Sequence, residues 1–144
     1  MRQWVLSFPY QLRFLFASRP ELMGKVLGIV YRAIASDLIK KAGLTRKSAQ
    51  SGAVTLIQRF GSALNLNIHF HMLFLDGVYA QNKQGKTTFQ RTNAPDQEEL
   101  AILVHTISHR VARFLERQGV LERDQENSYL QLEGMDEDPM QQLI

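Results

Sequence analysis

The feature that most constrains the fold is an apolar run at positions 65–79, Asn-Leu-Asn-Ile-His-Phe-His-Met-Leu-Phe-Leu-Asp-Gly-Val-Tyr, which encloses two histidines. Closed by the turn-forming pair Asp76-Gly77, it predicts a buried β-strand that enters a hairpin. Side chains alternate between the faces of a strand, so we expect His69 and His71 on one face and Phe70 on the other. Two imidazoles about 6–7 Å apart on one strand face can bind a single cation.

Two histidines are too few for a catalytic metal site, which usually has three protein ligands. The preceding apolar run predicts a strand at 53–60 that carries Gln58. If that strand pairs with the histidine strand at 67–75, the Gln58 amide oxygen can be the third ligand. Asp76 is the alternative ligand, although Asp before Gly is typical of a turn. Imidazoles with an oxygen donor suit Mg²⁺ or Mn²⁺, and zinc also remains possible. The alternative interpretation is that the two histidines are partly exposed polar residues of the strand and bind no metal.

The remaining patterns predict an α+β fold, with helices packed on an antiparallel sheet. Further strands are expected at 3–7 and 87–91, with a short one at 128–132. Helices are expected at 9–17, from a capping box at Ser18-Arg-Pro-Glu21 to Gly43, and over the periodic apolar residues from Leu100 to Leu115 before Gly119.

Charge divides the chain into two parts. Residues 1–121 hold 16 Lys and Arg against 7 Asp and Glu, a balance of +9, whereas residues 122–144 hold one Arg against 7 acids, a balance of −6. The first part is expected to be the core domain and the second an acidic tail or a truncated continuation. A basic body suits nucleic acid, with Arg46, Lys47 and Arg59 as candidate DNA contacts, although scattered basic residues also fit a solvated surface.

Several function classes are excluded or disfavoured. The chain has no cysteine, which excludes disulfides and thiolate zinc sites, and we expect a cytoplasmic protein. No apolar run is long enough for a transmembrane helix or a secretory signal. His105 and His109 share the i, i+4 spacing of H-E-x-x-H, but Thr106 replaces the glutamate, so we interpret them as solvated helix residues.

No nucleophile is evident from the residues. The sequence contains no G-x-S-x-G and no Gly-rich phosphate loop. Its tyrosines are Tyr10, Tyr31, Tyr79 and Tyr129, and the setting of each favours a structural role.

The segment from Arg59 to Tyr79 resembles the HUH-type transposases of rolling-circle insertion sequences, the two-tyrosine class and its common-region relatives. The opening Arg2-Gln-Trp-Val-Leu-Ser-Phe-Pro9 and the block Arg110-Val-Ala-Arg113 are also similar to that family. The resemblance covers most of residues 2–135. The long motif around the histidines is specific, whereas a His-hydrophobic-His triplet alone is not.

The resemblance implies an enzyme that nicks and joins single-stranded DNA at the ends of a mobile element. In the family, the histidine pair and a third polar ligand hold a divalent cation that polarises the scissile phosphate. A tyrosine attacks, forming a 5′-phosphotyrosine link and a free 3′-hydroxyl. Carried onto this chain, the resemblance implies that His69 and His71 bind Mg²⁺ or Mn²⁺, with Gln58 as the third ligand.

Two departures from the family pattern are visible. The family's catalytic tyrosine lies in a motif farther toward the C-terminus, followed closely by basic residues, and no tyrosine here has that setting. Family members also often begin with a cysteine-rich zinc module. We therefore expect the central part of a transposase without its nucleophile. The alternatives are a catalytically inactive DNA-binding remnant, or an unrelated hydrolase that uses metal-bound water, for which no general base is evident.

Overall fold

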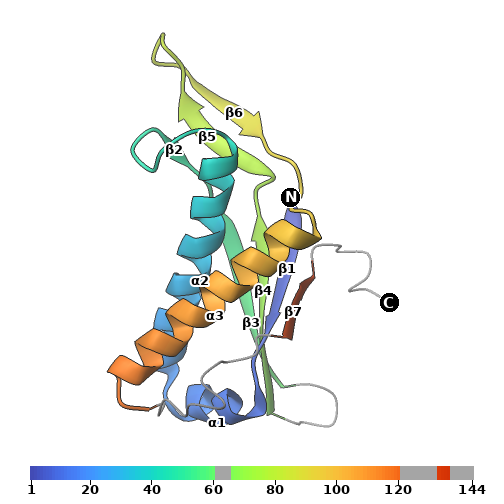
Figure 1. The fold of residues 1–144 in the computed structure, drawn as a ribbon, viewed down its shortest axis with the longest axis vertical. Coiled ribbons are helices and arrows are strands. Elements are labelled where there is room, and N and C mark those ends of the chain that lie inside the picture. The colour runs from blue at the N-terminus through green and yellow to red at the C-terminus, as the bar shows by residue number, and fades with distance from the viewer. Residues whose placement is uncertain (61–65, 121–132, 137–144) are drawn as a thin grey trace.

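The computed structural model describes residues 1–60, 66–120 and 133–136. Its described elements form two antiparallel sheets and three helices, which confirms the predicted α+β class (Figure 1). The helices are α1 (Tyr10–Ser18), α2 (Pro20–Lys41) and α3 (Gln97–Arg117). The four-stranded sheet has the order β3 (Ala53–Phe60), β4 (Leu66–Phe74), β1 (Arg2–Ser7) and β7 (Glu133–Asp136). The three-stranded sheet has the order β2 (Ala49–Gln50), β5 (Gly77–Gln81) and β6 (Thr87–Arg91).

The core lies between the helices and one face of the four-stranded sheet. Figure 1 shows α2 and α3 lying in front of this sheet, with α1 at its lower end. Phe70 of β4 meets the ring of Phe8 at 4.9 Å between centroids, and Phe74 stacks on Tyr31 of α2 at 5.6 Å. Both phenylalanines are fully buried. Because side chains alternate along a strand, the odd-numbered residues of β4 point away from the helices.

Strand β4 lies between β1 and β3, and this register fixes the neighbours of the histidines. His69 is opposite Ser7 of β1 and Gln58 of β3. His71 is opposite Val5 and Leu56 in the same two strands. The predicted pairing of strands 53–60 and 67–75 is therefore present.

The prediction of a hairpin at Asp76-Gly77 is wrong. The chain leaves the four-stranded sheet there, and β5 pairs instead with β2 and β6. The physical reason is that β1 and β3 already occupy both edges of β4. Gly77 is required by close packing, because a Cβ at this position would overlap the carbonyl oxygen of Gln90 in β6. The dipeptide thus marks the passage between the two sheets.

Some element boundaries also differ from expectation. Ser18 does not cap α2, because it is the last residue of α1 and its hydroxyl donates to the Leu15 carbonyl. Arg19 precedes α2 without a side-chain cap. At the start of α3, Asp96 does cap the helix, accepting from the Glu99 amide at 2.8 Å.

Two short strands were not anticipated. Strand β2 precedes the strand predicted at 53–60, and it pairs with β5. Strand β7 pairs antiparallel with β1, with Val5 opposite Asp136 and Ser7 opposite Glu133. The strand expected at 128–132 lies outside the described residues.

Candidate functional site

His69 and His71 lie side by side on the face of β4 that points away from the helices. Their ring centroids are 6.2 Å apart and their planes are inclined by 38°. Both side chains are half-buried, whereas Phe70 between them is fully buried on the opposite face. The alternation of this apolar run thus produces the predicted pair of imidazoles on one face.

His71 lies between two glutamines from the neighbouring strands. Gln58 Oε1 of β3 is 2.8 Å from His71 Nε2, and Gln3 Nε2 of β1 is 3.4 Å from His71 Nδ1. The two contacts are mutually consistent when Nε2 carries the hydrogen and donates to Gln58, while Nδ1 accepts from Gln3. Gln58 is opposite His69 in register, so its amide reaches diagonally to His71. The imidazole orientation is fixed from both sides.

Gln3 is a site residue that the sequence analysis missed. It shares a strand face with Val5 and Ser7, which are the residues opposite the two histidines. Its two-residue spacing from Val5 was visible in the sequence. Its proximity to His71 was not, because 68 positions separate them and the β1–β4 register sets their approach.

Burial lowers the pKa of His71, and the adjacent His69 lowers it further. The ordinary pKa of 6.5 already leaves most imidazoles neutral at neutral pH. The lowered value makes the neutral form still more favourable. A neutral imidazole retains a nitrogen lone pair, so less competition from protons opposes a cation at this position.

The rest of this face combines apolar side chains with the neutral donors. Val54 and Leu56 of β3 are 59% and 67% exposed, and Leu73 of β4 is 38% exposed. Within the described ranges, no group of three His, Cys, Asp or Glu residues is arranged to hold a metal ion. Among the described residues, a metal site here would therefore need an amide oxygen such as that of Gln58.

Asp76, the alternative ligand, contacts other groups at a distance from the histidine pair. Its carboxylate accepts from the Met1 ammonium at 2.8 Å and lies 3.8 Å from a guanidinium nitrogen of Arg2. Burial alone would raise the Asp76 pKa, but this hydrogen bond and the nearby positive charges lower it overall. Arg2 is opposite Phe74, so Asp76 is at the end of β4 that is remote from His69.

The second histidine pair has a different environment. The rings of His105 and His109 stack at 6.5 Å between centroids on α3, and both side chains are exposed. This placement agrees with the predicted solvated helix surface.

The three candidate DNA contacts lie on separate parts of the surface. Arg46 follows α2, and its Nε donates to Ser36 Oγ at 3.1 Å. Lys47 lines a hollow beside β2 and β5, and Arg59 is an exposed residue of β3, next to Gln58. Of the three, only Arg59 belongs to the strand that also carries the candidate ligand.

The described tyrosines have aromatic partners of their own. Tyr10 packs against Phe14 at 5.5 Å, and Tyr79 packs against Phe89 at 5.1 Å. Tyr31 stacks on Phe74 and donates to the Ser51 carbonyl at 3.1 Å. These contacts agree with the structural roles predicted for them. Tyr129 lies outside the described residues.

Fold and site together define an α+β protein that presents paired histidines and glutamines on an open sheet face. Comparison with known families gives its affiliation: the family model described as "Putative transposase" matches residues 52–138, more than half of the chain. The chain belongs to this transposase family, which indicates a role in transposition. The matched region includes Gln58, His69 and His71.

No curated protein and no solved structure matches the chain. Across the described residues, no helix has the length and apolar character needed to cross a membrane.

Proposed function

We propose that this chain belongs to the HUH rolling-circle class and serves the nicking and joining of single-stranded DNA at the ends of a mobile element. In this proposal His69, His71 and Gln58 hold a divalent cation, Mg²⁺ or Mn²⁺. The observation that carries the proposal is the 2.8 Å approach of Gln58 Oε1 to His71 Nε2, on the face that His69 shares.

The donor set fits such a cation. Nitrogen and oxygen donors suit Mn²⁺, and the oxygen of Gln58 suits a hard ion such as Mg²⁺. The 2.8 Å between Gln58 Oε1 and His71 Nε2 is close to the about 3 Å that separates adjacent donors around an ion bound at 2.0–2.1 Å. The lowered pKa of His71 favours the neutral imidazole that ligation requires.

Gln3 is the positioning residue in this proposal. For His71 Nε2 to become a ligand, its hydrogen must leave, and the neutral ring then carries hydrogen on Nδ1. Gln3 faces Nδ1 at 3.4 Å, and rotation of its amide would replace a donor by an acceptor for that hydrogen. Either tautomer of His71 thus has a partner on β1.

The surroundings of the histidine pair support DNA binding. A bound cation would supply Lewis-acid polarisation of the scissile phosphate. Arg59 follows Gln58 in β3, and its exposed side chain offers positive charge to a phosphate. The exposed Val54 and Leu56 provide apolar surface of the kind that marks an interaction site, and unpaired bases offer a matching apolar surface.

The test is a calorimetric titration of Mn²⁺ into the parent chain and into His69→Ala/His71→Ala. The matched control is His105→Ala/His109→Ala, which removes the other histidine pair. Binding to the parent and the control, but not to the strand variant, is the expected result. A folded parent that takes up no Mn²⁺, alone or with a single-stranded oligonucleotide, would overturn the proposed site. Loss of binding in the helix variant instead would move the site to α3.

The second candidate function is a catalytically inactive DNA-binding remnant. The ring contacts of Tyr10, Tyr31 and Tyr79 favour it, because none of these contacts involves the histidines. Incubation with Mn²⁺ and a labelled single strand should then yield no adduct that survives denaturing electrophoresis. An adduct would exclude the remnant, and Tyr10→Phe and Tyr79→Phe would test the two exposed described tyrosines as its source.

A further inference from the structure

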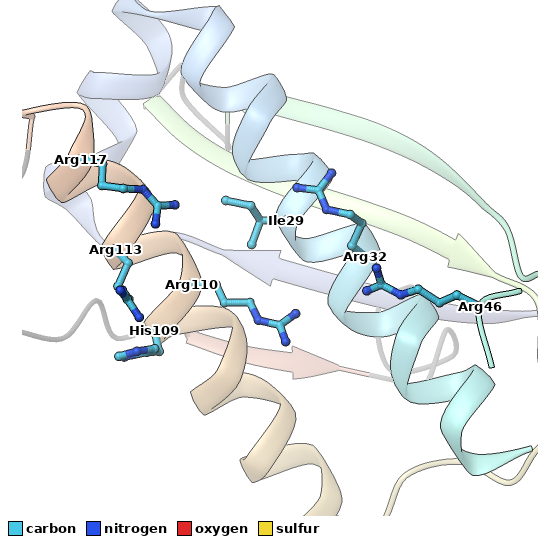
Figure 2. A pocket seen from close by; sticks show the side chains of 7 residues that line it. All are labelled: Ile29, Arg32, Arg46, His109, Arg110, Arg113 and Arg117. Carbon is cyan, nitrogen blue, oxygen red and sulfur yellow. The ribbon is translucent and has the colours of Figure 1, made fainter. Parts of the chain in front are cut away.

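A cavity of about 440 Å³ lies open between α2 and α3 and is lined by five arginines together with His109 and Ile29. We name it the arginine groove, defined by Arg32, Arg46, His109, Arg110, Arg113 and Arg117 (Figure 2). The groove belongs to the helical layer, whereas the histidine pair lies on the opposite side of the four-stranded sheet.

Three elements build the groove. Arg110, Arg113 and Arg117 follow the i, i+3, i+7 spacing, which places them along one face of α3 over about 10 Å. Arg32 comes from α2, and Arg46 comes from the segment after it. Figure 2 shows Arg110 and Arg117 pointing toward α2 and Arg46 pointing back toward Arg32. The cations converge through helix packing.

The positive charge of the groove is not balanced by its lining. Among the residues that the structure describes, no Asp or Glu lines it, and the ion pairs found within residues 1–60 and 66–120 involve none of the five arginines. Like charges held close together destabilise a folded chain, and a bound anion relieves that repulsion. Guanidinium groups also match phosphate oxygens with paired hydrogen bonds. The groove therefore has the chemistry of a phosphate-binding surface.

We propose that the arginine groove binds the phosphate backbone of nucleic acid as a second contact, separate from the histidine face. The stripe on α3 spans about 10 Å, the axial rise of about three nucleotides of one duplex strand. Several phosphates of one strand can thus meet several arginines at once. Backbone contacts of this kind position the DNA without reading its sequence. The inference does not depend on the proposed cation.

The test measures binding of labelled single-stranded and duplex DNA by fluorescence anisotropy, in EDTA and over a range of salt concentrations. Arg113→Gln/Arg117→Gln removes two groove charges while keeping helix-compatible side chains. Lys83→Gln/Lys86→Gln, in the exposed β5–β6 turn, removes two charges elsewhere and is the matched control. For duplex, the groove variant should lose about tenfold or more in affinity, and its log–log salt slope should fall by about two. The control should change little.

The two DNA forms distinguish the occupants. A larger loss for duplex assigns the groove to double-stranded flanks, and a larger loss for the single strand assigns it to the displaced strand; either supports the proposal. Equal losses in the groove and control variants would overturn it, because they indicate only general attraction. Unchanged DNA affinity with a lower Tm in the groove variant would also overturn it, by indicating that acidic groups of the chain itself occupy the groove.

This outcome is independent of the metal test. His69→Ala/His71→Ala should retain binding to the groove in EDTA. Failure of the Mn²⁺ titration would then leave the groove result intact, and loss of groove binding would leave the titration intact.

Discussion

The two faces of the four-stranded sheet have opposite chemistry. The outer face offers neutral nitrogen and oxygen donors, with His71 held between Gln3 and Gln58. On the other side, the helices that cover the sheet and the segment after α2 present five arginines around one groove. One surface has lone pairs suited to a cation, and the other has hydrogen-bond donors suited to anions. The two proposed ligands, a cation and phosphates, would thus lie on opposite sides of one α+β layer.

Both surfaces depend on the same core. Phe70 separates the histidines along β4 and is fully buried against Phe8, on the helix side. Because side chains alternate along a strand, the burial of Phe70 places the two flanking imidazoles on the opposite face at a fixed spacing. The following predictions test this division of faces, beginning with the largest effect.

Phe70→Ala should reduce the free energy of unfolding by about 3–5 kcal/mol, because it leaves a cavity in a fully packed position. Leu56→Ala is the control on the outer face, where the side chain is 67% exposed, and it should change stability by about 0.5 kcal/mol or less. Urea denaturation measures both. Comparable losses would mean that the outer face is covered in solution.

Gln58→Leu should weaken Mn²⁺ binding by roughly 100-fold, because it removes the oxygen donor beside His71. Gln58→Glu should retain or strengthen binding, since a carboxylate is a better ligand for a hard cation. Gln84→Leu, in the exposed β5–β6 turn, is the control. Calorimetry gives the affinities, and an unchanged Gln58→Leu affinity would remove this residue from the ligand set.

Gln3→Leu should weaken Mn²⁺ binding by roughly tenfold, because the His71 ring loses its Nδ1 partner. Gln3→Glu should restore the affinity, since a carboxylate accepts from Nδ1–H. The nitrogen chemical shifts of His71 report its tautomer and would reveal the loss directly. If Gln3→Leu kept the Mn²⁺ affinity of the parent, Gln3 would have a purely structural role.

The smallest effect concerns Asp37, on the helical face. Burial raises its pKa, a nearby Glu99 raises it, and Lys41 and Lys40 oppose the rise. A raised folded-state pKa means that the charged form is disfavoured in the folded chain, so the protein gains stability as pH falls from that pKa toward the ordinary 3.8. Asp37→Asn should therefore raise Tm at neutral pH by no more than about 2 °C.

The gain in Tm from Asp37→Asn should vanish below the ordinary carboxyl pKa, where Asp37 of the parent is protonated in both the folded and the unfolded chain. Thermal unfolding at several pH values measures it. A Tm that falls in the variant at neutral pH would show that the carboxylate is stabilised by its lysine neighbours instead.

The sequence predicted the structure best where the pattern lies within one short segment of the chain. Alternation along β4 and the apolar period of α3 identified both elements, and Gln58 was found because β3 immediately precedes β4 in the chain. Contacts between distant segments were not accessible in this way. The approach of Gln3 to His71 depends on the register of β1 against β4.

The arginine groove shows the same limit. The spacing of Arg110, Arg113 and Arg117 was visible, but their convergence with Arg32 and Arg46 required the packing of α3 on α2. At Asp76-Gly77, a strong local turn signal was wrong because β1 and β3 had occupied both edges of β4. Long-range pairing decided the outcome at each of these positions.

The central position of β1 also has a consequence for folding during synthesis. Both partners of this strand, β4 and β7, follow it in the chain, and β4 begins only at Leu66. At about 5–20 residues per second, a ribosome needs roughly 3–13 s to extend the chain from β1 to that point. Through this interval the apolar side chains of Trp4 and Leu6 have no sheet to join, so their burial must wait until β4 has been synthesised.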